Sequence, residues 1–246
     1  MRGLDNHGAT CWLNAIVQCM RVCRDWEQGL VLGQPSLLDK GSLLDKGSLL
    51  DKSTDLDKEF SLDKEFSLDF YRLIHGETDN TTQFLSHLPF GNIASDSQEA
   101  LLYILDKLDV KDFEGEETQT VIFPDGRSVT KNKTMFWFHQ EKPDVVSDYV
   151  DSSGKKHNVA VIERKLTTVP NVLVSDTVRE ELFGKKLIGI VCWGFGHYVA
   201  YVKEAGDWWF VNDNHINKQD PVIPRGYIGF YGVGKTYSQR THFEEA

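Results

Sequence analysis

The sequence predicts an α+β fold in which a helical first part is followed by an antiparallel sheet. Residues 10–23 and 95–110 carry apolar residues at the three- and four-residue spacing of helices that bury one face. From residue 120 onward the pattern changes to short apolar runs separated by turn residues, which is typical of strands joined by hairpins. Helices first and strands afterwards indicate a helical lobe packed against an antiparallel sheet.

The 246 residues are enough for one large domain made of two tightly joined lobes. A hydrophobic share of 40% and an aromatic share of 11% can supply a core. We expect the helical lobe over residues 1–110 and the strand lobe over residues 111–246. The sequence has no run of about 18 apolar residues, so we expect no membrane span. Residues 1–11 lack the apolar stretch of a secretory signal.

Within the first lobe, Thr10 is a good N-cap for the helix at 10–23. The buried faces of the two helices are expected to consist of Trp12, Leu13, Ile16, Val17 and Met20, and of Leu101, Leu102, Ile104, Leu105 and Leu108. Strands are expected at 120–123, 134–138, 158–162, 172–174, 187–192, 198–202, 208–211 and 227–231, with turns at 124–126 and 152–154.

Residues 36–70 contain a repeat in which Leu-Asp recurs every six residues, from Leu38 to Leu68. Six residues turn a helix by roughly 240°, so these leucines would not form one helical stripe. On a strand they would share a face, and short turn-like repeats stay open as an alternative. We expect an irregular, partly mobile insertion without a catalytic role, and a solvated surface for the charge run at 55–64.

The charge and cysteine content narrow the class of protein. A net charge of −10 disfavours nucleic acid and favours basic partners. Four cysteines are too few for a disulfide framework and form no CxxC pair, and the histidines show no metal-ligand spacing. We therefore expect no metal site and no cofactor. An intracellular location, cytoplasmic or nuclear, is the expectation for a chain with free thiols.

Cys11 stands just after a glycine-containing loop, at the first turn of a predicted helix. Backbone N–H groups at a helix N-terminus favour a thiolate and can also receive a developing oxyanion. Far downstream, His197 opens a predicted strand and follows Gly196. The next strand ends in Asn212 and Asp213, and antiparallel pairing would bring one of them beside the histidine. This predicts a nucleophile, a base and a residue that orients the base.

Three segments of the chain resemble the conserved boxes of the ubiquitin-specific proteases, a papain-like family. The cysteine box is matched by Gly3, Leu4, Asn6, Gly8, Thr10, Cys11, Asn14, Ala15 and Gln18. The histidine box is matched by 196–202 with 208–213, the DxQE box by 96–99, and the closing strand by 227–231. The resemblance spans nearly the whole chain. It implies a helical thumb lobe on an antiparallel β palm, with short fingers.

The resemblance also implies roles for particular residues. Cys11 would attack the carbonyl of the C-terminal glycine of ubiquitin, and His197 would take the thiol proton and later protonate the leaving amine. Asn212 would hold the imidazole; a one-residue slip in register would give this place to Asp213, which otherwise supports the same cluster. Asn6 would donate a hydrogen bond to the oxyanion, although it could also be a simple turn residue.

Substrate binding is implied for a second set of residues. The basic ubiquitin tail would contact Asp96, Gln98 and Glu99, while Gly196 and Tyr198 would line the channel for its glycines. The same Asp and Glu also fit a capping box, which needs no ligand, and both interpretations can hold at once.

The chain departs from the family pattern at several points. Ala9 replaces the usual Asn of the cysteine box, and the two CxxC pairs of the zinc-bearing fingers are absent. Any fingers, at about 119–162, must therefore hold together by packing. Residues 173–176 replace the usual LxRF motif, which leaves part of the ubiquitin-facing surface open to question.

These features favour a cysteine-type deubiquitinase that cleaves the peptide or isopeptide bond after a C-terminal Gly-Gly. Its partners would be ubiquitin or a ubiquitin-like protein and its conjugates, without nucleic acid or membrane. One alternative keeps the mechanism and changes the substrate to another ubiquitin-like modifier or a viral polyprotein. Another is a catalytically silent ubiquitin-binding scaffold.

Overall fold

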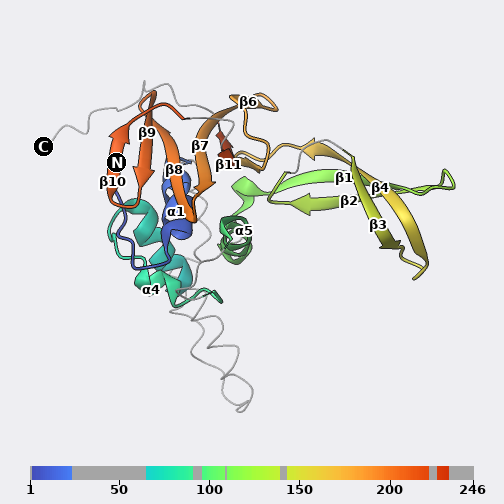
Figure 1. Cartoon of the computed structure of the whole chain (residues 1–246), viewed down its shortest axis with the longest axis horizontal. Helices are drawn as coiled ribbons and strands as arrows, with labels where there is room; N and C mark the ends of the chain where they lie inside the picture. Colours follow the sequence, from blue (N-terminus) through green and yellow to red (C-terminus); the bar gives the residue numbers. More distant parts are fainter. Residues whose placement is uncertain are drawn as a thin grey trace, which may run out of the picture.

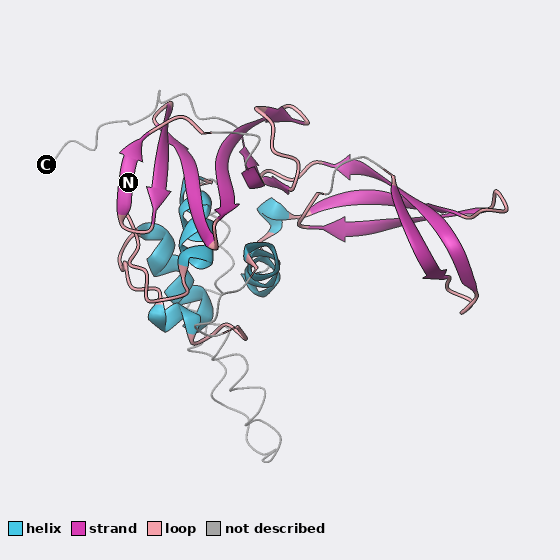
Figure 2. Ribbon diagram, viewed as in Figure 1, coloured by secondary structure: helices cyan, strands magenta, loops and turns pink. Residues whose placement is uncertain are grey.

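A computed structural model describes residues 2–23, 65–90, 96–108, 110–138, 143–221 and 226–232. The chain forms helices and two antiparallel sheets, which confirms the predicted α+β class. Figures 1 and 2 show the helices gathered on one side of the larger sheet, with the smaller sheet projecting away from them. We call the larger one the main sheet and the smaller one the outer sheet.

The described helices are α1 (Cys11–Val22), α4 (Thr82–Leu85), α5 (Ser97–Leu108) and the short 3₁₀ helix η3 (Lys111–Phe113), and residues 65–75 are also helical. Helix α1 packs against strands β7 and β8 of the main sheet and against α5. Its apolar residues, Trp12, Leu13 and Ile16 among them, are buried as their spacing predicted. The two long helices thus agree with the sequence to within about two residues at each end.

The main sheet has the order β10-β9-β8-β7-β11-β5, with β6 paired to β7. Its strands are β5 (Leu173–Ser175), β6 (Glu181–Leu182), β7 (Lys185–Gly194), β8 (His197–Glu204), β9 (Asp207–Asn212), β10 (His215–Lys218) and β11 (Gly226–Gly232). The outer sheet has the order β2-β1-β4-β3. Its strands are β1 (Gly115–Ile122), β2 (Ser128–Met135), β3 (Asp144–Val150) and β4 (Lys156–Thr168).

One hydrophobic core joins the helices to the main sheet. It contains Leu13 and Met20 of α1, Ile104 of α5, Val191 of β7 and Phe230 of β11, all fully buried. Since apolar burial is the main favourable term in folding, this shared core fixes α1 on the sheet more firmly than any polar contact could. The outer sheet has a separate small cluster.

The outer sheet holds together without a metal cluster among the described residues. Val121, Phe123, Ala160 and Ile162 form its buried cluster. At the β3–β4 turn, Asp151 accepts hydrogen bonds from the backbone N–H groups of residues 153 and 155 and lies 2.9 Å from the His157 ring. These bonds and the hydroxyl of Ser153 lower the pKa of the Asp151 carboxyl below its ordinary value. Packing and turn hydrogen bonds therefore stabilise the outer sheet.

The sequence misplaced parts of the outer sheet. We expected a strand at 134–138, whereas β2 spans Ser128–Met135 and the chain bends at 136–137. Strands β3, β6 and β10 were not expected at all. Strand β2 is exposed at every residue but the last, and every β3 residue is at least partly exposed, so neither carries the apolar alternation that reveals a half-buried strand.

Most of the predicted insertion at 36–70, with the charge run at 55–64, lies outside the described residues. The prediction of irregular structure is wrong for residues 65–70, which are helical. Phe66 and Phe70 stand four residues apart and both rings pack on Phe84, with ring centroids 4.9 and 5.0 Å away. These aromatic side chains supply the buried face that the leucines lack, and Leu68 is 41% exposed.

No helix among the described residues is long and apolar enough to cross a membrane.

The packing of the helix at 65–75 can be tested with two substitutions. Phe70→Ala removes a fully buried ring and should lower the free energy of unfolding by about 3–5 kcal/mol. Leu68→Ala, on the exposed side of the same helix, should change it by about 0.5 kcal/mol or less. Chemical denaturation of both variants measures the difference. Equal effects would contradict the packing of this helix against the core.

Candidate active site

His197 is the first residue of β8, and its imidazole is held from the neighbouring strand. Its Nε2 atom lies 2.7 Å from Oδ1 of Asn212, the last residue of β9. An amide oxygen only accepts, so Nε2 carries the proton in this hydrogen bond. The neutral ring then has its lone pair on Nδ1, free to act as a base.

The tight β8–β9 hairpin brings Asn212 close to His197. Glu204 pairs with Asp207 across a two-residue turn, and the ladder continues to Ala200 paired with Val211. The register therefore places Asn212 opposite Val199, two residues from His197 along β8, at the end of the hairpin where β8 begins. Asp213 lies one residue further on, with Oδ2 at 3.7 Å from His197 Nε2, beyond hydrogen-bonding distance. The amide rather than the carboxylate thus makes the direct contact.

Cys11 is the first residue of α1 and is half-buried against the shared core. One turn further along the helix, Asn14 Nδ2 donates a 2.7 Å hydrogen bond to Oδ1 of Asp213. Because the same carboxylate faces His197, the first turn of α1 adjoins the imidazole. Helix α1 and strand β8 also pack directly on each other. The fold therefore brings the first turn of α1, which begins with Cys11, and the start of β8, which carries His197, to the same carboxylate.

Asp213 accepts hydrogen bonds from several parts of the chain at this site. Its Oδ2 accepts a 2.8 Å hydrogen bond from Asn6 Nδ2, and its Oδ1 accepts the bond from Asn14. Its backbone oxygen accepts from the N–H of Leu4 at 3.2 Å. Asp213 adopts φ 52°, a left-handed conformation that Asp tolerates better than most residues. It thus joins the N-terminal segment, α1 and the β9–β10 turn.

Asn6 is fixed from both sides. Its Oδ1 accepts from the hydroxyl of Thr10 at 3.3 Å, while one amide hydrogen goes to Asp213. Thr10 occupies the N-cap position, but its side chain makes no capping hydrogen bond to α1. It accepts instead from the N–H of His7, at 3.2 Å, so it shapes the loop rather than the helix end.

A polar stripe on α1 was not predicted as part of the site. Asn14, Gln18 and Arg21 follow one another at spacings of four and three residues, on one face of the helix. Gln18 and Arg21 donate to the backbone oxygen of Arg2, at 2.9 and 2.6 Å. Burial lowers the pKa of Arg21 to about 10, so its guanidinium is still charged at neutral pH. The stripe ties down the segment that carries Asn6.

A second polar group lies where α5 begins. Asp96 Oδ1 accepts from the N–H groups of Gln98 and Glu99, at 2.7 and 3.3 Å, which caps the helix as expected. Its Oδ2 accepts a 2.8 Å hydrogen bond from the hydroxyl of Tyr227. Burial, followed by this bond, raises the pKa of Tyr227 to about 12. Asp96 and Glu99 are exposed and Gln98 is half-buried, so all three can reach a bound chain.

Tyr198 is buried, with only 7% of its surface exposed. Its ring lies 4.4 Å from that of Trp193 and 6.2 Å from that of Tyr227, and its hydroxyl lies 3.5 Å from the N–H of Ser97. It therefore connects the start of β8 to the start of α5. Gly196 has φ 77° in the β7–β8 turn, directly before His197.

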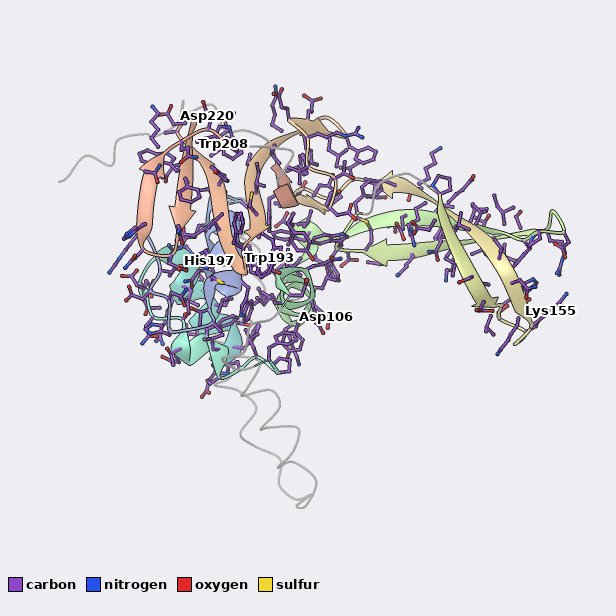
Figure 3. All side chains as sticks on the ribbon, viewed as in Figure 1. Asp106, Lys155, Trp193, His197, Trp208 and Asp220 are labelled. Atoms are coloured by element: carbon purple, nitrogen blue, oxygen red, sulfur yellow. The ribbon has the colours of Figure 1, made fainter. Side chains whose placement is uncertain are left out.

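A surface hollow of about 510 Å³ lies beside Asn212 and Asn6. It is lined by Asp5, Asn6, His7, Asn212, Asp213, Asn214 and His215, which come from the loop before α1 and from the β9–β10 turn. Each of these residues has a polar or charged side chain. Figure 3 shows His197 and Trp193 at one end of the main sheet, with Trp208 and Asp220 at the opposite end.

The sequence model of the ubiquitin carboxyl-terminal hydrolase family matches residues 2–188, about three quarters of the chain. The chain belongs to this family. The match includes Cys11 and the polar stripe of α1 and ends before His197 and Asn212. As a ubiquitin carboxyl-terminal hydrolase, the protein is a cysteine-type deubiquitinase with the papain-like α+β fold of its family.

Solved structures agree on the fold of this hydrolase. It is similar to a chain of the SAGA DUB module Ubp8/Sgf11/Sus1/Sgf73 bound to ubiquitin aldehyde, with a TM-score of 0.63 and 16% identity. The match covers 96% of this chain and 70% of that one. A form of the module with a substituted Ubp8, bound to monoubiquitin, has a TM-score of 0.62 and 17% sequence identity. That match covers 96% of this chain and 69% of the other. No curated protein matches the sequence.

The other cysteines of the hydrolase are unsuited to nucleophilic chemistry. Burial raises the pKa of Cys192 to about 11 and that of Cys19 well above its ordinary value. Cys23 is buried, with its sulfur 3.2 Å from the backbone oxygen of Cys19. No group of side chains in the described ranges is arranged to hold a metal ion.

Thiol labelling should separate Cys11 from the other cysteines. The thiolate is the reactive form, so a raised pKa keeps Cys19 and Cys192 as unreactive thiols at pH 8. Iodoacetamide at that pH should modify Cys11 in the native enzyme and the three buried cysteines only after denaturation. Modification of Cys192 should begin as the pH approaches 11. Peptide mass spectrometry measures this order, and equal labelling of Cys192 and Cys11 would contradict it.

The backbone at Gly3 lies very close to the backbone of residues 213 and 214. We expect this contact to matter for activity, although Gly3 itself is not one of the proposed site residues. A Cβ there would come 2.5 Å from Cα of Asn214 and 2.7 Å from the backbone oxygen of Asp213, and both are backbone atoms. Gly3→Ala should therefore displace Asn6 and lower kcat on a ubiquitin-fluorophore substrate by about tenfold to a hundredfold. Unchanged turnover, with an unchanged melting temperature, would show that this approach is not needed.

Proposed function

We propose that this deubiquitinase uses Cys11, His197 and Asn212 to cleave ubiquitin from its conjugates after the C-terminal Gly-Gly. The observation that carries the proposal is the 2.7 Å hydrogen bond from the histidine to Asn212, beside the helix turn that begins with Cys11. The bond leaves Nδ1 as the basic nitrogen, and a thiol near that nitrogen is the arrangement that cysteine hydrolases need.

The reaction follows from these positions. His197 accepts the Cys11 proton as the sulfur attacks the scissile carbonyl, and a tetrahedral oxyanion forms. The free amide hydrogen of Asn6 and the backbone N–H at the start of α1 stabilise that charge. Collapse breaks the carbon–nitrogen bond, and the imidazolium gives its proton to the leaving amine. Water, deprotonated by the same histidine, then hydrolyses the thioester and regenerates the thiol.

Recognition of the basic ubiquitin tail is proposed for the residues at the start of α5. Asp96 and Glu99 are exposed carboxylates, and Gln98 stands between them. The capping bonds of Asp96 pre-organise its side chain, which lowers the entropy lost on binding. Gly196 and Tyr198 complete this side of the cleft, where a glycine pair can pass because neither glycine adds a side chain.

The acidic hollow beside Asn212 is suited to bind the part of the substrate that carries the leaving amine. Asp5 and Asp213 line it and would attract the lysine that carries the ubiquitin. The protein would act inside the cell, in cytoplasm or nucleus, since all four cysteines are free. We retain the proposed division into a helical lobe over 1–110 and a strand lobe over 111–246.

Single substitutions test the proposed triad. A ubiquitin propargyl probe should label the wild type and His197→Ala far more slowly, and should not label Cys11→Ala. Hydrolysis of a ubiquitin-fluorophore substrate should fall by about 10³-fold or more for Cys11→Ala or His197→Ala, and by less for Asn212→Ala. Normal turnover by Cys11→Ala would place the reaction elsewhere.

The choice of third residue is tested by comparing Asn212→Ala with Asp213→Asn. The amide contacts the imidazole directly, so Asn212→Ala should shift the pH profile of kcat/KM as well as its height. Asp213→Asn should also release the hydrogen bonds to Asn6 and Asn14, and so lower kcat. A substrate panel with the interferon-induced homologue, NEDD8 and SUMO distinguishes ubiquitin from other modifiers.

A further inference from the structure

Three hairpins of the main sheet close with a two-residue turn ending in glycine. These turns are Phe183-Gly184, Phe195-Gly196 and Ala205-Gly206. Both residues of each turn have positive φ, at 50° and 75°, 55° and 77°, and 54° and 89°. Such turns favour Asn or Gly at the first position, and a bulky residue there is strained. Two of the three carry a phenylalanine.

The two phenylalanines differ in what they contact. The ring of Phe183 packs edge-on against Phe138, with centroids 4.9 Å apart, so packing offsets its strain. Phe195 has a relative exposure of 109%, the full surface of the side chain. Its ring lies in solvent at the tip of the β7–β8 hairpin, where a large apolar side chain gains nothing for folding.

Phe195 therefore combines two unfavourable features, a strained backbone and a fully exposed ring. Strain of this kind is kept at functional sites, where a position is constrained by something other than stability. The turn lies two residues before His197, at the end of the sheet nearest the reacting groups (Figure 3). Trp193, 49% exposed on the same hairpin, extends the apolar surface toward Tyr198.

We propose that Phe195 is a specificity-determining residue that packs on an aliphatic side chain of the substrate tail. The inference rests on the proposed function, because the tail must pass this turn to place its carbonyl between Cys11 and His197. The last two tail residues are glycines, so the first side chains that can meet the ring belong to the third or fourth residue from the scissile carbonyl. These lie about 7–13 Å from it in an extended chain, within reach of the turn. In ubiquitin the last leucine of the tail occupies this range.

The substitution Phe195→Asn separates function from stability. Asn fits the left-handed position, so the variant should melt about 2–4 °C higher than the wild type. Its kcat/KM on ubiquitin-aminomethylcoumarin should nevertheless fall by about tenfold, as for loss of one aromatic contact at an interface. If the ring has a purely structural role, the variant should melt at a lower temperature than the wild type and should keep its activity.

Two variants of the same chain serve as matched controls. Phe183→Asn makes the same replacement in a turn of the same geometry, and should leave kcat/KM within twofold of the wild type. Ala205→Asn relieves the same backbone conformation at the opposite end of β8, and should raise the melting temperature without changing activity. A tenfold loss of activity in either control would overturn the assignment to Phe195.

A double-mutant cycle identifies the partner side chain. The last leucine of the ubiquitin tail is replaced by alanine in the fluorogenic substrate, and both enzymes are measured on both substrates. If the ring contacts that leucine, Phe195→Asn loses most of its effect on the alanine substrate, to twofold or less. An equal tenfold effect on both substrates, or no effect on either, overturns the inference. Failure of the wild type on the unmodified substrate overturns the proposed function itself.

Discussion

The site depends on one carboxylate, that of Asp213. It accepts hydrogen bonds from Asn6 and Asn14 and faces the ring of His197, so the N-terminal loop, helix α1 and strands β8 and β9 meet at a single side chain. A partly buried carboxylate needs donors, and here both donors are neutral amides. The side chains that stabilise the carboxylate, Asn6 and Asn14, are thereby held in fixed positions beside the proposed reacting groups. The positions of Asn6, the proposed oxyanion donor, and of His197, the proposed base, are therefore coupled through this carboxylate.

The places of Cys11 and His197, the proposed catalytic pair, could be predicted from sequence because their signals are local. Cys11 sits at a helix start and His197 at a strand start, and each position follows from short-range periodicity. Asn212 was also predictable, since a two-residue hairpin leaves few possible registers. Asn14 matches the cysteine box but was not predicted as a site residue, because its place on the helix does not identify its partner. That partner, 199 residues away, is known only once the fold is known.

The same contrast explains the errors in the fold. The main sheet packs on helices, so its strands carry apolar runs that the sequence reveals, as in β7 and β8. Strand β3 has no buried residue, and its place is set by backbone pairing with β4 rather than by its own side chains. At the end of the repeat, burial of Phe66 and Phe70 in the core favours a helix, although the six-residue spacing of the leucines does not. Aromatic burial against Phe84 decided the conformation there, a tertiary effect that a repeat analysis does not contain.

The outer sheet enters and leaves the body of the protein at adjacent positions, since Glu116 at the start of β1 pairs with Thr168 at the end of β4. Its buried cluster of Val121, Phe123, Ala160 and Ile162 is separate from the core of the helices. The sheet projects away from the helices (Figure 1). An element attached in this way can lengthen, shorten or exchange its hairpins while its anchor points stay fixed. The length and surface of the outer sheet can thus change, in evolution or by engineering, without displacing the residues around Asp213.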